Sequence, residues 1–381
     1  MSLHLTKIRA YWSHRQGLDH SLYQSAPAEI LSRTGWARSV AGCGPYLTLF
    51  SRTGTSRESV DAAVANIEIH ELPAARGCTY IVPAADYALA LQVGQPFREA
   101  ERKVAGTLGV TDAEIDKLSA AVLKALKSGP LDPEAIREFV GSTARSLGDA
   151  GKKKGITTTL PVALGALQAH GEIRRIPING RLDQQRYKYA LWSPNPLATH
   201  ELTLAEAQTQ LASRYFRWIG PATLAEFQWF SGLSGKAAKA ATAPLNLVPL
   251  EDGHLILPED VEGFQSFQIP KSPQVSFVSS LDAISSLRRN PESLADDGIL
   301  KKPGVSDSHH HLILDRGRLI GFWGYDSFAE EIVWKCFDSP SPGFEKVLNQ
   351  TTLYIRQQLG DARSFSLDRP QSRVARLVAL R

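Results

Sequence analysis

Positively charged side chains within residues 151–190 are the clearest chemical feature of this sequence. Eight lysines and arginines there oppose only Glu172 and Asp183, which leaves a local charge of +6. The whole chain of 381 residues carries only +4, so the rest of it sums to −2. Cations gathered in this way bind phosphates and release counterions from a nucleic acid. We therefore predict an anionic partner for this segment; the alternative is a charged solvent face that protects a hairpin edge.

These cations fall into two groups. The stretch GEIRRIPINGRLDQQRYKY alternates in polarity around Asn179-Gly180, a dipeptide typical of two-residue hairpin turns. The stretch GKKKGITTT precedes a predicted helix, whose start can bring backbone amides, hydroxyls and lysines to phosphates. Pro161 and the apolar run after it favour recognition of the DNA backbone or shape over base reading. The residues that we expect to contact DNA are Lys152, Lys153, Lys154, Thr157, Thr158, Thr159, Arg174, Arg175, Arg181, Arg186 and Lys188.

Three predicted helices lead into this hairpin. Apolar residues recur at helical spacing in DAEIDKLSAAVLKALKSGP, which ends at Gly129-Pro130. In LDPEAIREFVG, Asp132 is a candidate N-cap and Pro133 suits the first helical position. ITTTLPVALGALQAHG gives the third helix, which ends at Gly171. Three helices and a hairpin in this order are typical of a winged helix.

The same order recurs on both sides. After residue 201, the helices LTLAEAQTQLASRYFRWIG, PATLAEFQWFSG and LSGKAAKAATAP precede a hairpin that turns at Asp252-Gly253. A fainter N-terminal copy has a hairpin turning near residues 75–77. Its expected helices lie near residues 7–16, 26–33, 44–50 and 57–65.

After Glu262 the sequence favours strands, a long mobile loop over residues 290–307, and a last helix that stops at Gly360. We therefore predict an α+β fold of tandem winged-helix units, each a helix-turn-helix with a β-hairpin wing, and a small C-terminal α+β domain. The predicted boundaries are 1–110 for an N-terminal winged-helix-like unit, 111–195 for a central basic winged helix, 196–262 for a third unit and 263–381 for the last domain.

Several functional classes are disfavoured. No apolar run approaches the roughly 18 residues that a spanning helix needs, and the N-terminus lacks the apolar core of a signal peptide. Three scattered cysteines indicate neither disulfides nor a zinc site. In a strand, only His309 and His311 of the HHH run could share a metal, and no ligand partner is fixed nearby. We expect a cytoplasmic monomer without metal, cofactor or membrane contact, whose partner is double-stranded DNA.

The stretch LASRYFRWIGPATLAEFQWFSGL resembles the winged-helix family that includes the AlkZ-like crosslink-repair DNA glycosylases. The pieces GPYLTLFSR, RGCTYIVPAADY, VSSLDAISSLRR and LILDRGRLIGFW agree with it, so that the resemblance spans nearly the whole chain. It implies tandem winged helices that form a concave, basic DNA-binding face. It also implies removal of alkylated purines, including N7-linked crosslinks, without a metal.

One motif departs from the family. The resemblance implies Gln-x-Gln or Gln-x-Asp before GPYLTLFSR, but here Arg38 and Val40 occupy those two positions, and Tyr80 stands where the family often has histidine. An N7-alkylpurine is already a good cationic leaving group. The enzyme need only stabilise an oxocarbenium-like sugar and hold a water. An arginine adds like charge to that cation, and a valine has no acceptor.

Either the chemistry is lost or other groups perform it. The candidate catalytic residues are Glu71 on the first hairpin, Asp282 at a position that matches the family, and His310 on a strand of the last domain. For Asp282, the two roles are orienting a loop and polarising water. The predicted function is a DNA glycosylase for N7-alkylated or crosslinked purines. The alternative is a non-catalytic DNA-binding protein that senses damage or regulates transcription.

Overall fold

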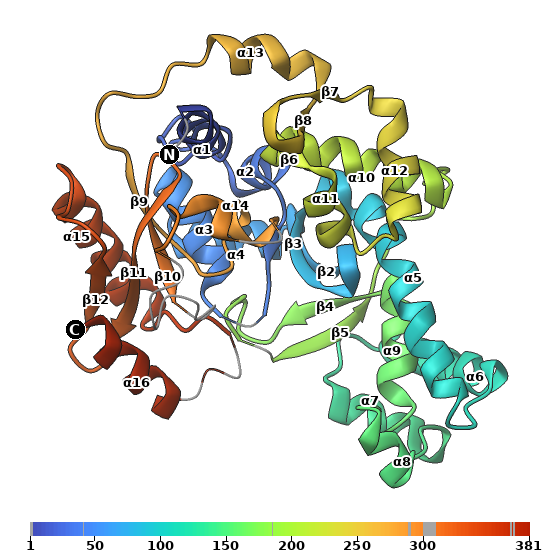
Figure 1. Cartoon of the computed structure of the whole chain (residues 1–381). Coiled ribbons are helices and arrows are strands. Elements are labelled where there is room, and N and C mark those ends of the chain that lie inside the picture. Colours follow the sequence, from blue (N-terminus) through green and yellow to red (C-terminus); the bar gives the residue numbers. More distant parts are fainter. Residues whose placement is uncertain are drawn as a thin grey trace.

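The computed structural model describes residues 3–40, 42–184, 186–288, 291–299, 310–365, 368 and 370–381. The first part of the chain consists of helices around a small sheet of strand order β1-β3-β2 (Figure 1). Its elements are α1 (Leu3–Arg15), α2 (Pro27–Thr34), β1 (Ala37–Arg38), α3 (Gly44–Thr53), α4 (Arg57–Ala65), β2 (Ile69–Pro73), β3 (Thr79–Pro83) and α5 (Tyr87–Gly106). The hairpin β2–β3 turns through residues 75–77, as predicted.

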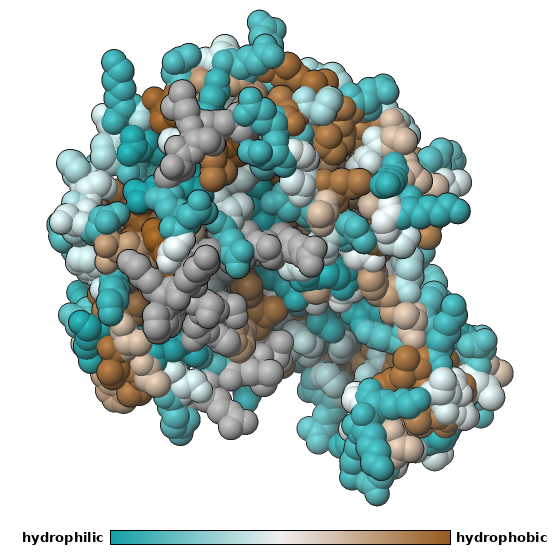
Figure 2. Space-filling model, viewed as in Figure 1, coloured by the Kyte–Doolittle hydropathy of each residue, from teal (hydrophilic) through white to brown (hydrophobic). Residues whose placement is uncertain are grey.

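The middle part has the predicted order of helices followed by a hairpin. Its elements are α6 (Asp112–Leu126), α7 (Pro133–Val140), α8 (Gly148–Lys153), α9 (Leu160–Ala169), β4 (Ile173–Pro177) and β5 (Tyr187–Leu191). Asp132 caps α7, because its side chain accepts hydrogen bonds from the Glu134 and Ala135 N–H groups. One hydrophobic cluster, from Ala105 at the end of α5 to Tyr189, is otherwise made of residues of this part and the segment that leads into it. In Figures 1 and 2, helices α6–α8 stand off from the body as a separate lobe.

The third part repeats the order of helices and hairpin, with strand order β6-β8-β7. Its elements are α10 (Leu204–Ile219), β6 (Ala222–Thr223), α11 (Leu224–Ser231), α12 (Gly235–Thr242), β7 (Val248–Pro249), β8 (His254–Ile256) and α13 (Val261–Ser266). Both α10 and α11 begin at a threonine capping box. The hairpin β7–β8 turns at Asp252-Gly253, as predicted.

The last part is a four-stranded antiparallel sheet, β12-β11-β10-β9, with helices against it. Its elements are β9 (Val275–Val278), α14 (Ala283–Ser286), β10 (His311–Asp315), β11 (Arg318–Asp326), β12 (Glu331–Cys336), α15 (Phe344–Tyr354) and α16 (Pro370–Leu380). Residues 291–299 contain a short 3-10 helix with Leu294 fully buried, so the prediction of a mobile loop is wrong there. The rest of the predicted loop, at 290 and 300–307, lies outside the described residues.

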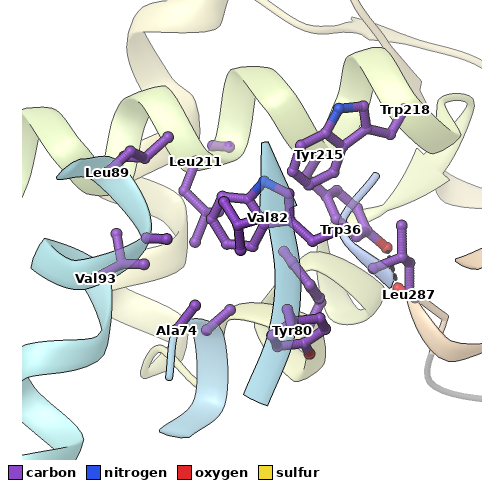
Figure 3. Packing of buried hydrophobic residues seen from close by; sticks show 14 of the residues in the cluster. Trp36, Ala74, Tyr80, Val82, Leu89, Val93, Leu211, Tyr215, Trp218 and Leu287 are labelled. Atoms are coloured by element: carbon purple, nitrogen blue, oxygen red, sulfur yellow. Dashed lines mark hydrogen bonds between the residues drawn. The ribbon is translucent and has the colours of Figure 1, made fainter. Parts of the chain in front are cut away.

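Three of the hydrophobic clusters cross from one part to another. Figure 3 shows Trp36, Tyr80 and Val82 of the first part packed with Tyr215 and Trp218 of α10. The Tyr215 hydroxyl donates a 2.9 Å hydrogen bond to the Leu287 carbonyl, which ties in the last part. A second cluster joins residues of α3 to residues of β9, β11 and α15. The small β1–β3–β2 sheet is therefore held rigidly between the first, third and last parts.

The link between β4 and β5 differs from the predicted two-residue turn. Register runs from Ile173 opposite Leu191 to Pro177 opposite Tyr187, so nine residues, 178–186, separate the strands. Leu182 in this link is buried with residues of α3, and its N–H donates a 2.9 Å hydrogen bond to the Tyr46 hydroxyl. The chain does turn at residues 177–180, where the Gly180 N–H donates a 3.2 Å hydrogen bond to the Pro177 carbonyl. The prediction of a two-residue hairpin connection at Asn179-Gly180 is wrong, because the link is longer. Burial of Leu182, a contact distant in sequence, outweighs the local turn preference.

Candidate functional site

The small sheet places the candidate residues on two opposite faces. Arg38 lies opposite Tyr80, whereas Ala37 and Glu71 both lie opposite Ile81. Side chains alternate along a strand, so Arg38 and Tyr80 share one face and Glu71 lies on the other. Glu71 therefore does not occupy the place of the two residues that the resemblance assigns to catalysis.

Ser39 joins Glu71 on its face. The Ser39 hydroxyl donates a 2.6 Å hydrogen bond to Glu71 Oε1, and Arg175 Nη1 of β4 lies 3.8 Å from Glu71 Oε2. The Arg175 guanidinium lies 4.4 Å from the centre of the Tyr187 ring, a cation–π contact within β4–β5. Ser39, Glu71 and Arg175 thus link β1, β2 and the basic hairpin through side chains.

A small pocket lies beside these residues. It has about 10 Å³ of free volume, and its lining includes His70, Glu71, Arg175 and Tyr187. That volume suits a single water molecule. His70 is buried, and its Nε2 has no hydrogen-bond partner among the described residues. Burial, with Arg174 and Arg175 nearby, lowers the pKa of His70 to about 3, so this ring is neutral at pH 7 and can accept or donate a hydrogen bond to such a water.

The opposite face carries Arg38 and Tyr80. The Arg38 guanidinium lies 5.3 Å from the centre of the Tyr80 ring and donates a 3.3 Å hydrogen bond to the Thr79 carbonyl. Burial raises the pKa of Tyr80 to about 12, against the opposing effect of Arg38. The Tyr80 hydroxyl is therefore neutral at physiological pH and cannot serve as a general base.

Asp282 lies in a buried network at the start of α14. Its two oxygens accept 2.8 Å hydrogen bonds from Arg52, and both side chains are 0% exposed. The same carboxylate caps α14 by accepting from the Ile284 N–H. These contacts hold α3 against α14. They are of the kind expected if Asp282 orients a loop, which is one of its two predicted roles.

His310 lies in a third environment, at the start of β10. It is buried, with its ring centre 5.5 Å from that of Phe322. The adjacent His311 donates from Nε2 to the Ala362 carbonyl and accepts at Nδ1 from the Ser280 N–H. Burial lowers the pKa of His311 to about 4, which fits this neutral form. His309 lies outside the described residues, within which no group of His, Cys, Asp or Glu side chains is arranged to hold a metal ion.

The residues expected to contact DNA differ in exposure. Exposed side chains are Lys152, Lys153, Lys154, Thr157, Arg186 and Lys188, and half-buried ones are Thr158, Arg174, Arg175 and Arg181. Thr159 is fully buried, and its hydroxyl accepts a hydrogen bond from the Arg145 N–H, which leaves it no surface for a phosphate. Arg181 pairs with Asp183 and donates to the Leu359 carbonyl. The hairpin therefore turns part of its charge inward.

Sequence reasoning missed two residues of this region. Ser39 lies between the two motif positions, but β1 has only two residues and no alternation that would assign faces. Arg76, in the turn before β3, has a left-handed φ of 55° and lies 3.9 Å from the centre of the Trp229 ring. The aromatic stretch around Trp229 predicts a core, and nothing local connects it to the first hairpin.

Two comparisons with known proteins found a match, one in sequence and one in fold. The family model described as DNA glycosylase AlkZ-like matches residues 43–326. Among solved structures, the DNA glycosylase AlkZ of Streptomyces sahachiroi is similar, with a TM-score of 0.72 and 16% identity over 94% of this chain and 98% of that one. No curated protein matches in sequence. No described helix is both long and apolar enough to cross a membrane. The matched family model covers most of the chain, which therefore belongs to the AlkZ-like DNA glycosylase family.

Proposed function

We propose that the protein is a DNA-repair glycosylase that binds duplex DNA and excises N7-alkylated or crosslinked purines, with Glu71 as its catalytic carboxylate. Membership of the AlkZ-like family supports the reaction class. The hydrogen bond between Ser39 and Glu71 carries the assignment of the carboxylate, because it places an acceptor beside the strand that bears the altered motif.

The reaction needs few catalytic groups, because the alkylated base is already a good leaving group. Water attacks C1′ of the nucleotide, the C1′–N9 bond breaks, and its electron pair neutralises the cationic base as it leaves. Glu71 accepts the proton of the water and stabilises positive charge on the sugar. Ser39 fixes one carboxylate oxygen at 2.6 Å, and the adjacent pocket has room for one water. The neutral His70 ring supplies that water with a second polar partner.

DNA binding is assigned to the middle part as a winged helix. Its support is the order of helices α6, α7 and α9 before the hairpin β4–β5, with a core of its own. Exposed lysines at the end of α8 and exposed cations on β5 and just before it supply the charge. In this proposal these groups contact phosphates and position the duplex, a role that carries no sequence information by itself. Asp282 is proposed as a positioning residue, because its ion pair with Arg52 holds α3 against α14.

The test is strand cleavage at a single N7-alkylguanine after incubation with the protein and treatment with alkali. The wild type is expected to cleave above a protein-free control. Glu71→Gln is expected to lower the rate by at least a hundredfold, within the range of general-base catalysis. Glu172→Gln removes an exposed carboxylate beside β4 and serves as the matched control with unchanged rate. Equal rates for wild type and Glu71→Gln would remove Glu71 from the mechanism.

Arg38 favours a second candidate, a DNA-binding protein without glycosylase activity. Its guanidinium stands where the family resemblance implies an amide, and it carries the same sign of charge as an N7-alkylpurine. At about 4 Å, two such charges repel by about 4 kcal/mol at an effective dielectric constant near 20. Salt-sensitive binding of duplex DNA with no cleavage in the same samples would support this candidate.

A further inference from the structure

Two half-buried arginines, Arg38 of β1 and Arg76 of the turn before β3, lie beside the start of β3 without a carboxylate partner among the described residues. Arg38 stacks on Tyr80, and Arg76 stacks on Trp229. Within the described part of the chain, no carboxylate oxygen lies within 4.0 Å of either guanidinium, although most other arginines have such a partner. Both cations act electrostatically on the Tyr80 hydroxyl, so the two charges lie in one neighbourhood.

These two side chains are held in place before any ligand arrives. Arg38 is fixed by its strand pairing with Tyr80 and by its bond to the Thr79 carbonyl. Arg76 is fixed by its left-handed backbone and by close packing on Gly232, where a β-carbon would come within 3.1 Å of Arg76 Cα. Figure 3 shows Tyr80 at the edge of the buried cluster, with its hydroxyl pointing away from Trp36. A guanidinium has five N–H donors, so Arg38 retains donors for an anion beyond its bond to the Thr79 carbonyl.

We infer that Arg38 and Arg76 form a seat for one phosphodiester group of the DNA backbone beside the lesion. This inference rests on the proposed function for the identity of the anion. Half-buried cations without counterions are costly, and a phosphate offsets that cost with charge-assisted hydrogen bonds. A bound phosphate also neutralises the charge of Arg38, which lies on the opposite face of the small sheet from Glu71. Arg38, which stands where the family resemblance implies glutamine, then changes how the DNA strand that carries the lesion is held.

The test uses binding of a duplex that contains a tetrahydrofuran abasic analogue, which no glycosylase can cleave. Affinity is measured against salt concentration for the wild type, Arg38→Gln, Arg76→Gln and the double variant. Each lost phosphate contact lowers the slope of log K against log salt by about 0.9. Because both arginines hold one phosphate, we expect each single variant to lower the slope by up to about 0.9 and the double variant by no more than about 0.9, whereas Arg38→Lys keeps the slope because it keeps the charge. Arg33→Gln, an exposed arginine paired with Glu29, is the control.

A second measurement locates the phosphate. Single linkages around the abasic analogue are replaced, one at a time, by neutral methylphosphonates. The wild type is expected to bind more weakly at one or two linkages next to the lesion, and the double variant is expected to be indifferent there. Unchanged slopes in both single variants, or a wild type indifferent to every linkage, would overturn the seat. Glu71→Gln should retain the wild-type slope, so that failure of the catalytic proposal stays distinguishable from failure of this one.

Discussion

Arg52 and Asp282 form a two-point ion pair in which both side chains are 0% exposed. The pair joins α3 to the start of α14, and Arg52 also donates to Gln16 Oε1 and to the Thr48 carbonyl. Gln16 in turn donates to the carbonyls of Thr34 and Trp218. One buried network thus connects the first, third and last parts of the chain around the small sheet.

Breaking this pair should cost stability rather than chemistry. In Asp282→Asn the buried Arg52 loses its counterion, and removal of one partner of a buried pair costs about 3–5 kcal/mol. Urea unfolding measures that loss. The excision rate of the remaining folded protein should match that of the wild type. A stable variant with a much lower rate would instead assign Asp282 to catalysis.

The link between β4 and β5 gives a second prediction. Leu182→Ala removes a buried side chain from the contact with Tyr46 and should cost about 2–5 kcal/mol. It should also release residues 178–186 to proteases. Ile178→Ala, at a side chain 53% exposed in the same link, is the control and should behave as the wild type in both measurements. Equal protection of the link in both variants would mean that Leu182 does not anchor it.

Local chemistry predicts much of this fold, and contacts distant in sequence decide the rest. Asp132 starts α7 through its side chain, and Gly171 and Gly360 follow helices with a positive φ, so a short window of sequence reveals all three. The two-residue hairpin expected at Asn179-Gly180 became a longer link because Leu182 is buried against α3, more than 130 residues earlier in the chain. The helix α16 was not predicted, because the last helix expected from the sequence ends at Gly360. None of the stretches that carry the family resemblance lies in α16.

The candidate site shows the same division. Glu71 stands out as a carboxylate on a predicted hairpin, but its hydrogen bond to Ser39 depends on β1 pairing with β3, and two residues carry no strand periodicity. The charge of the basic hairpin is readable from composition. Which of its cations turn inward depends on partners such as Glu71, Asp183 and the Leu359 carbonyl.

The exposed cations of the basic hairpin and those turned inward should respond differently to substitution. Arg186→Gln combined with Lys188→Gln removes exposed charges, and the salt slope of duplex binding should fall by about 1.8 while the midpoint of urea unfolding stays constant. Arg181→Gln, which loses the contacts with Asp183 and the Leu359 carbonyl, should lower the unfolding midpoint and leave the slope unchanged. The opposite pattern would mean that the link opens when DNA binds.

Buried His70 should make stability depend on pH. Its pKa is about 3 in the folded protein, because burial and the nearby Arg174 and Arg175 disfavour the charged ring, and about 6.5 when the chain is unfolded. The unfolded state therefore binds more protons between these two values. The contribution of His70 to stability is fully present above pH 6.5 and is lost as the pH falls towards 3.

Between pH 7.5 and pH 5.0, His70 should account for a loss of about 2 kcal/mol in the free energy of unfolding. His70→Phe keeps an aromatic ring against Trp192 and should lose that much less than the wild type over the same interval, whereas His170→Phe, at an exposed position, should not. His311, whose pKa is lowered to about 4, contributes in the same direction to all three proteins, so the comparison isolates His70. Equal losses in wild type and His70→Phe would mean that water reaches the ring and that the small pocket beside Glu71 is open to solvent.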